Sequence, residues 1–139
     1  MKQLCATILV SLFLLTACNQ KNNEPKNSVQ RTVLRYEVDS AGNISDSFPE
    51  VKKQLKEIAI QINKNADRVV IYSYTEKTDS EEESMAIAKR QADAAKQAMM
   101  QFGERVYYNV GVELKGFAEP ISVANPADKT NRRIEIEQM

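Results

Sequence analysis

The chain has 139 residues, and its 19 Lys and Arg residues are balanced by 19 Asp and Glu residues. With 42% hydrophobic and 27% charged residues it has the composition of a globular protein, and its length suits one domain. The absence of His excludes Ser-His-Asp catalysis, Cys-His catalysis and His-based zinc sites, and the zero net charge argues against nucleic-acid binding.

The first 17 residues have the pattern of a secretory signal peptide. A positive charge at Lys2 is followed by an apolar run from Leu4 to Ala17, which is shorter than the roughly 20 residues that a membrane-spanning helix needs. The run ends in Leu15-Thr16-Ala17-Cys18, which resembles a bacterial lipoprotein box. The resemblance implies cleavage before Cys18 and attachment of diacylglycerol to its sulfur. The alternative is an ordinary signal peptide with a chance Cys at its end.

Residues 18–29 contain the predicted lipidated Cys18 and a polar segment that has no hydrophobic period. This composition is typical of a flexible tether, which can hold a domain at most about 35–40 Å from its anchor. Because Cys5 leaves with the signal peptide and Cys18 carries lipid, no disulfide can form. We therefore expect a membrane-anchored protein whose folded domain spans residues 30–139.

The folded domain begins with a predicted strand over residues 32–39, because Leu34, Tyr36 and Val38 recur at every second position and so share one face. Ser47 and Glu50 have the spacing of a capping box, which places Ser47 at the N-cap of a helix. This helix is expected to stop at residues 63–65. Its apolar stripe consists of Val51, Leu55, Ile58, Ala59 and Ile62.

Residues 69–74 are mainly β-branched or aromatic, which predicts a second strand in the interior of a sheet. Ser80 and Glu83 form another capping box, and the long helix that follows extends to about Phe102, with Gly103 as its C-cap. Apolar residues have a similar spacing in a coiled coil, but three heptads between two strands favour a helix that packs on the sheet. The stripe consists of Met85, Ala88, Ala92, Ala95, Met99 and Phe102.

A third strand is predicted over residues 106–114, followed by a loop over 115–131 and a last strand over 132–137. In the last strand Ile134 and Ile136 are expected to point inward, and Arg133, Glu135 and Glu137 outward. The element order β-α-β-α-β-β predicts an α/β (α+β) two-layer sandwich, in which two helices cover one face of a mixed sheet.

Three segments resemble the OmpA-like C-terminal domain, the peptidoglycan-associating module of outer-membrane proteins and of small Pal-like lipoproteins. Asn131-Arg132-Arg133-Ile134-Glu135-Ile136 is similar to the family's Asn-Arg-Arg-Val-Glu-Ile. Gly116-Phe117-Ala118-Glu119-Pro120-Ile121 looks like a shortened Gly-Tyr-Gly-Glu…Pro-Ile, and Tyr36-Glu37-Val38-Asp39-Ser40-Ala41 is similar to the family's first strand. The element order agrees over residues 31–138, so the resemblance implies the fold of this family.

The resemblance also implies a ligand site, in which the family grips the diaminopimelate of the peptidoglycan stem with an Asp and an Arg. Glu76 stands at the position of the Asp, and Gln91 at the position of the Arg, fifteen residues later. Asp79 and Ser84 stand where the family has Gly and Asn. Physically the site recognises a zwitterion, because a carboxylate takes the ligand's ammonium group and a guanidinium takes its carboxylate. Glu76 keeps the negative charge, whereas Gln91 lacks the positive one.

Other basic residues are candidates for the missing charge. Arg90 is next to Gln91 in sequence but about 100° round the helix, so it does not simply replace the family's Arg. Arg132 and Arg133 alternate across the last strand, so one of them can face the same loop as Glu76. The alternatives are that Asn131, Arg132 and Arg133 form a loop-closing hydrogen-bond cluster, and that Glu76 is an exposed carboxylate at the end of a strand.

Two further patterns are compatible with ligand binding, but a structural role explains each of them better. The acidic run 78–83 has oxygen ligands for calcium but lacks a spaced Asp-x-Asp-x-Asp-Gly loop, so helix capping explains it better. Tyr72 and Tyr74 share a strand face, and Tyr107 and Tyr108 are expected on opposite faces of the third strand; packing on the sheet is favoured over sugar stacking. We expect no metal, no cofactor and no catalytic residue.

The patterns together predict a non-catalytic lipoprotein that associates non-covalently with peptidoglycan and links the membrane to the cell wall. Asn19, rather than the Asp that retains enterobacterial lipoproteins in the inner membrane, favours the outer membrane. We expect the domain in the periplasm, with the cell surface as the alternative. The alternative is a periplasmic protein–protein interaction module on the same fold, with an eroded diaminopimelate site. The exposed acidic residues near the second helix start would then select a basic partner.

Overall fold

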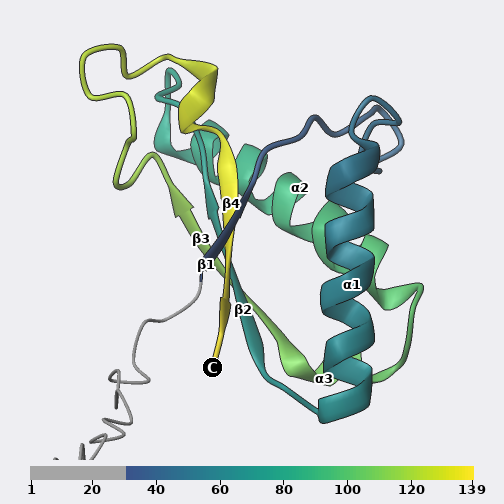
Figure 1. Cartoon of the computed structure of the whole chain (residues 1–139). Helices are drawn as coiled ribbons and strands as arrows, with labels where there is room; N and C mark the ends of the chain where they lie inside the picture. The colour runs from purple at the N-terminus through teal and green to yellow at the C-terminus, as the bar shows by residue number, and fades with distance from the viewer. Residues whose placement is uncertain (1–30) are drawn as a thin grey trace, which may run out of the picture.

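The structure is a computed structural model that describes residues 31–139 (Figure 1). The predicted signal peptide, Cys18 and the tether to residue 29 lie outside the described residues. No helix between residues 31 and 139 is long and apolar enough to cross a membrane. The elements are β1 (Arg31–Leu34), α1 (Pro49–Asn65), β2 (Val69–Tyr74), α2 (Glu81–Met100), α3 (Arg105–Asn109), β3 (Val110–Gly116), the 3₁₀ turn η1 (Lys129–Asn131) and β4 (Arg133–Gln138).

The four strands form one mixed sheet in the order β1-β4-β2-β3. Strand β4 runs antiparallel to both β1 and β2, whereas β2 and β3 are parallel. Helices α1 and α2 lie on the same side of the sheet (Figure 1). The predicted two-layer α/β architecture, its β-α-β-α-β-β order and the interior position of β2 are confirmed.

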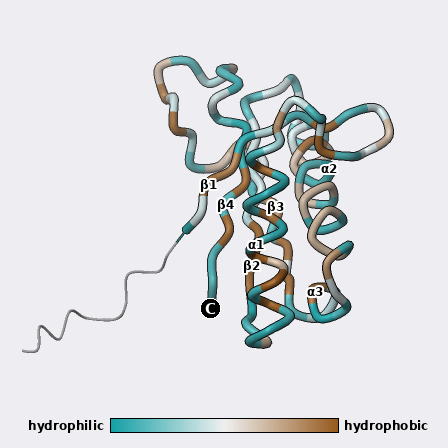
Figure 2. Tube along the Cα trace, turned by 45° about the vertical axis from the view of Figure 1, so that its right-hand side comes forward, coloured by the Kyte–Doolittle hydropathy of each residue, from teal (hydrophilic) through white to brown (hydrophobic). Residues whose placement is uncertain are grey.

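The core forms where the apolar stripes of the helices meet the inward residues of the strands. Figure 2 shows hydrophobic residues along the strands and alternating with hydrophilic residues around the helices. On α2 the alanines of the stripe are fully buried, and their small size lets this helix approach β2 and β3 closely. The predicted α1 stripe is confirmed except that Ile58 is only partly buried, and on α2 Met85 is partly buried and Phe102 is exposed.

Two predicted boundaries at the start of the domain were wrong. Strand β1 ends at Leu34, because residue Val38 pairs only with Ile44 in an isolated bridge. The N-cap of α1 is Phe48 rather than Ser47, and no side chain caps the helix. Pro49 occupies the first helical position, where proline is favoured because it has no N–H to leave unpaired and its φ is already helical. By contrast, the predicted cap of α2 is confirmed, since Ser80 Oγ accepts a hydrogen bond from the Glu83 N–H at 3.1 Å.

The predicted third strand also started too early, because residues 105–109 form the short helix α3. Val106 is fully buried and anchors this helix, and Asn109 Nδ2 donates hydrogen bonds to the carbonyls of Ala66 (2.9 Å) and Asp67 (3.1 Å). Tyr107 and Tyr108 consequently lie on a helix and are exposed, not on opposite faces of a strand. The alternation of apolar residues through this segment was therefore misleading.

Gly103 is not the C-cap of α2, which is Gln101. The chain passes so closely over Asn63 at this point that a Cβ on residue 103 would lie 2.2 Å from the Asn63 amide oxygen. Glycine is favoured there because its φ of 153° is a backbone conformation that residues with a side chain rarely adopt, and because Asn63 would have to move to admit a Cβ.

Candidate ligand-binding site

Three of the predicted site residues, Glu76, Asn131 and Arg132, lie where β2 ends and β4 begins. We call this the loop end; it consists of residues 75–80 and 117–132, drawn above the strands in Figure 1. Two backbone hydrogen bonds join its segments, from the Thr75 N–H to the Gly116 carbonyl (2.8 Å) and from the Lys77 N–H to the Pro126 carbonyl (2.8 Å). The residues that follow β2 are therefore fixed against the long loop that follows β3.

Glu76 and Arg132 form a bidentate ion pair at the loop end. Arg132 Nε donates to one carboxylate oxygen at 2.9 Å, and Nη2 donates to the other. Glu76 is 8% exposed, so it is not the exposed strand-end carboxylate of the alternative interpretation. The side chain of Arg132 is 30% exposed. Of the two arginines that precede β4 or begin it, Arg132 is the one that faces Glu76.

The ion pair is charged at neutral pH. Burial alone would raise the pKa of Glu76, but the hydrogen bonds from Arg132 and from its own backbone N–H outweigh this and hold the pKa below its usual value. The hydrogen bond to Glu76 in turn raises the pKa of Arg132. The loop end thus carries one fixed carboxylate and one fixed guanidinium side by side.

Asn131 is fully buried beside the ion pair and closes the long loop. Its Oδ1 accepts from the Ser122 N–H at 2.8 Å, and its Nδ2 donates to the carbonyls of Pro126 (3.2 Å), Ser122 (3.4 Å) and Asn125 (3.5 Å). Every polar atom of this amide therefore has a partner in the loop backbone. Asn131 holds the loop in place and does not itself face the surface.

Arg133 was expected to point outward to solvent, and this prediction was wrong, because the residue is 3% exposed. Its guanidinium carbon lies 3.9 Å from the centroid of the Tyr74 ring, which stands opposite it in the β2–β4 register. It also donates to the carbonyls of Glu119 (3.1 Å) and Asn131 (3.3 Å). The loop folds over this part of the sheet and covers Arg133, which sequence alternation alone cannot reveal.

Gln91 lies beneath the loop end, in the seam between β2 and α2, and is 3% exposed. Its Nε2 donates to the Tyr74 carbonyl at 3.1 Å, whereas its Oε1 has no hydrogen-bond partner. The Oγ of Ser73 and the Oγ1 of Thr75 are likewise buried without a partner. Gln91 therefore supports the end of β2 from below and does not reach the surface.

A groove of about 510 Å³ opens at the loop end between the start of α2 and the end of β3. Exposed Asp79 lines it, and so does Ser84, whose hydroxyl is 2.7 Å from that of Thr78. Because Thr78 already donates to the Ser80 carbonyl at 2.7 Å, Ser84 is the donor of this pair. Lys77 and Lys115 also line the groove.

The structure does not bring Arg90 to this site. Its Nη2 donates to the carbonyl of Asp39, in the loop between β1 and α1, and it lines a separate shallow depression with Lys89, Asp93 and Gly42. Of the predicted ligand residues, Glu76, Arg132 and Asn131 thus lie together. Asp79 and Ser84 line the groove. Gln91 is buried between β2 and α2, and Arg90 lies outside the site.

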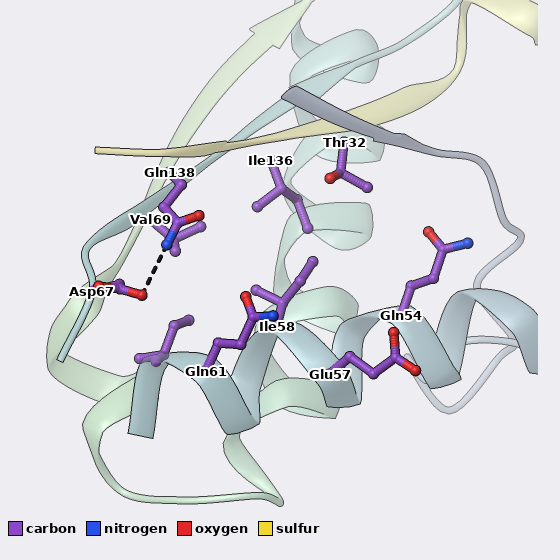
Figure 3. Close-up of a pocket in the computed structure, with 10 residues that line it drawn as sticks. Thr32, Gln54, Glu57, Ile58, Gln61, Asp67, Val69, Ile136 and Gln138 are labelled. Carbon is purple, nitrogen blue, oxygen red and sulfur yellow. Dashed lines mark hydrogen bonds between the residues drawn. The ribbon is translucent and has the colours of Figure 1, made fainter. Parts of the chain in front are cut away.

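A second cleft, of about 280 Å³, lies between α1 and the sheet (Figure 3). Ile58, Ile62, Val69 and Ile136 form its apolar floor, and glutamines and carboxylates form its rim. None of the predicted site residues lines this cleft. Within residues 31–139, no group of three or more His, Cys, Asp or Glu side chains is placed to hold a metal ion.

The strand order and the one-sided helix layer define a two-layer α/β domain. The sequence matches the OmpA family over residues 42–133, and the chain belongs to this family. OmpA family domains are non-catalytic, which confirms that the chain is not an enzyme. A comparison with curated protein sequences found no match.

Solved structures share the fold at low sequence identity. The OmpA-like domain of FopA1 from Francisella tularensis subsp. tularensis SCHU S4 has a TM-score of 0.62 and 15% identity, over 77% of this chain and 70% of that one. The peptidoglycan-associated lipoprotein from Burkholderia pseudomallei has a TM-score of 0.61 and 18% identity, over 77% and 89%. The periplasmic domain of Helicobacter pylori MotB has a TM-score of 0.56 and 18% identity, over 78% and 80%.

Proposed function

We propose that this chain is a lipid-anchored protein of the outer membrane whose OmpA family domain associates non-covalently with peptidoglycan and so links the membrane to the cell wall. Family membership supports the wall-binding role, as does the shared fold with a peptidoglycan-associated lipoprotein. The lipoprotein box at Cys18 and the polar tether support the anchor. A periplasmic location of the domain is supported by the MotB neighbour, which is a periplasmic domain.

The ion pair between Glu76 and Arg132 carries this proposal. A guanidinium has five N–H donors, and Glu76 uses two of those on Arg132, so three remain for a ligand carboxylate. Each Glu76 oxygen keeps acceptor capacity for a ligand ammonium group. A zwitterion such as the diaminopimelate of a peptide stem can therefore bind across the intact pair. Arg132, between η1 and β4, supplies the positive charge that the family resemblance places on the following helix, at Gln91.

The remaining site residues have supporting roles in this proposal. Asp79 presents a second carboxylate to the groove, and Ser84 is held against Thr78 at its wall. Gln91 acts as a positioning residue, because it binds the carbonyl of Tyr74, two residues before Glu76. Asn131 positions the loop that adjoins Arg132. Arg90 takes no part.

Co-sedimentation of lipid-free residues 19–139 with purified diaminopimelate-type sacculi tests the proposal. We expect the wild type to sediment with the wall. Glu76→Ala should weaken binding by roughly 10–150-fold, since charge-assisted hydrogen bonds contribute about 1.5–3 kcal/mol. Glu104→Ala, which removes an exposed carboxylate at the other end of the sheet, is the matched control and should bind like the wild type.

Failure of the wild type to sediment would overturn the wall-binding role. If Gln91→Arg then sedimented, the fold would be that of a wall binder whose natural site has been lost. The anchor is tested separately in the full chain. Cys18→Ser should move the protein from the membrane pellet to the soluble fraction, and retention in the pellet would contradict lipidation at Cys18.

A specific feature favours a second candidate function, binding of a basic partner protein in the periplasm. Asp79, Glu81, Glu82 and Glu83 are all exposed and form no ion pair within residues 31–139. They make an acidic surface at the start of α2, next to the groove. A partner bound to this exposed surface should dissociate as the salt concentration is raised. Binding at the Glu76–Arg132 pair should depend less on salt, because that pair is partly buried and salt screens it less.

A further inference from the structure

The end of the sheet opposite the loop end is where the chain enters the domain. We call it the entry end; it consists of Arg31, residues 65–69, α3 and the C-terminus. Arg31 stands opposite Glu137 in the β1–β4 register, and the Met139 N–H donates to the Arg68 carbonyl at 2.9 Å. Asn109 joins α3 to the α1–β2 connection. In Figure 1 both α3 and the C-terminus lie toward the lower end of the sheet, away from the loop end.

Two tyrosines on α3 are the most conspicuous side chains of the entry end. Tyr107 is 60% exposed and Tyr108 is 81% exposed, although both follow the fully buried Val106. Their rings pack edge to face, with centroids 5.0 Å apart, and Lys96 Nζ lies 5.7 Å from the Tyr107 centroid. A rigid turn thus presents two rings that have an apolar body and a polar hydroxyl, the side-chain type that is enriched at membrane–water interfaces.

The charges of the entry end suit a bilayer surface. Lys64 and Arg68 are exposed and form no ion pair within the described part of the chain, and Arg105 is exposed beside them. Exposed Glu104 and half-buried Asp67 offset two of these three cations. The entry end is therefore close to neutral and does not repel anionic headgroups, so the tyrosine rings supply most of the contact.

The tether brings this end to the membrane. Residues 19–30 separate Cys18 from Arg31, and even fully extended they reach at most about 45 Å. A tether of this length gives an effective concentration on the order of millimolar, so even a weak contact with the bilayer is populated. Strand β4 spans the distance between the two ends, about 20 Å for its six residues.

We infer that the entry end rests on the lipid headgroups through Tyr107 and Tyr108, and that this contact turns the loop end toward the wall. The inference rests on the membrane anchor of the proposed function. It concerns a different surface from the wall site, and it assigns a lipid bilayer as the partner of α3.

Hydrogen exchange on the tethered chain tests this inference. Residues 18–139 are coupled through the Cys18 thiol to maleimide lipid in vesicles of phosphatidylethanolamine and phosphatidylglycerol. Compared with the same chain free in solution, amides in residues 104–110 should exchange at least about fivefold more slowly. Amides in residues 118–127, at the loop end, should not change. Because the link is made chemically, the result does not depend on whether Cys18 is acylated in the cell.

Two double variants separate a specific contact from general crowding at the vesicle. Tyr107→Ser with Tyr108→Ser should abolish the slowing, with an unchanged unfolding temperature showing that α3 is still folded. Ile121→Ser with Val123→Ser removes exposed hydrophobic residues at the loop end, which are 55% and 74% exposed, and should leave the slowing intact.

Equal exchange with and without vesicles would overturn the inference, as would slowing at residues 118–127 instead. Slowing in free protein at raised concentration would assign the tyrosines to a second copy of the chain, which also overturns it. Sacculus binding is measured on the untethered chain, so failure of the wall-binding proposal is distinguished from failure of this one.

Discussion

Two buried side-chain amides, Asn131 at the loop end and Gln91 in the seam between β2 and α2, are satisfied very differently. Asn131 is fully buried, and its two polar atoms contact four backbone groups. The side chain of Gln91 is nearly as buried but makes one hydrogen bond within the protein, to the Tyr74 carbonyl. Its oxygen has no protein partner, and neither do the buried hydroxyls of Ser73 and Thr75, on either side of Tyr74. The loop end is a completed hydrogen-bond network, whereas the seam is an incomplete one.

This contrast indicates which part of the domain holds the charged groups of the candidate site. A buried polar group without a partner costs free energy, whereas a fully paired network makes the surrounding structure rigid. The family resemblance places the positive charge of the ligand site on α2, at Gln91. In this chain the only guanidinium that contacts Glu76 within residues 31–139 is on Arg132, at the start of β4. The charged pair therefore belongs to the loop network and not to the helix.

The largest effect is expected from Asn131→Ala, which breaks the completed network. The change leaves the Ser122 N–H and the loop carbonyls without their partner, and each unsatisfied buried group costs about 1–3 kcal/mol. We expect the free energy of unfolding to fall by about 2–4 kcal/mol, measured by urea denaturation. Asn125→Ala, which truncates an exposed amide in the same loop, should cost less than about 0.5 kcal/mol. Equal effects of the two changes would show that the network is not what holds the loop.

The intermediate effect is expected from Arg132→Met, which leaves Glu76 buried without its partner. The pKa of Glu76 is depressed in the folded state, so the pair stabilises the fold above the unfolded pKa of roughly 4.3 and stops doing so as the pH falls through the folded pKa. At pH 7 the variant should lose about 1.5–3 kcal/mol of unfolding free energy. As the pH falls through the depressed folded pKa of Glu76, the difference from the wild type should shrink, because Glu76 then becomes protonated in the wild type as well.

Urea denaturation at pH 7 and at pH 3 measures this difference. Arg90→Met is the matched control, since it removes an exposed guanidinium that binds only a backbone carbonyl, that of Asp39, and that lines a separate depression. Its effect should be within about 0.5 kcal/mol at both pH values. A loss for Arg132→Met that did not change with pH would mean that packing, rather than the charge pair, stabilises the loop end.

The sequence predicted the fold well because the features that determine it are local. The apolar stripes of α1 and α2 and the β-branched run of β2 repeat at the helix and strand periods, so they indicate the elements directly. The capping box at Ser80 was right because its partner is three residues away. The failed cap at Ser47 had the same spacing, but the helix begins at Pro49, a residue favoured at the first helical position, so Phe48 and not Ser47 is the N-cap.

The candidate site was less predictable, since it depends on contacts between distant segments. Which arginine faces Glu76 is decided by the register of β4 against β2 and by the loop that covers Arg133. The sequence placed both arginines at the right end of the sheet but left the choice open. The helix α3 was missed for a similar reason, because Asn109 fixes it through carbonyls some 40 residues earlier in the chain.

The smallest effect is expected from Gln91→Leu, which removes the amide of the incomplete network. The change loses one hydrogen bond, to the Tyr74 carbonyl, but it also removes a buried oxygen that has no partner. These contributions oppose each other, so the free energy of unfolding should change by less than about 1 kcal/mol. Asn131→Ala in the same urea series is the comparison, because each variant deletes a buried side-chain amide. If Gln91→Leu proved as destabilising as Asn131→Ala, the seam would have to contain hydrogen bonds that complete it, such as those of a buried water among Gln91, Ser73 and Thr75.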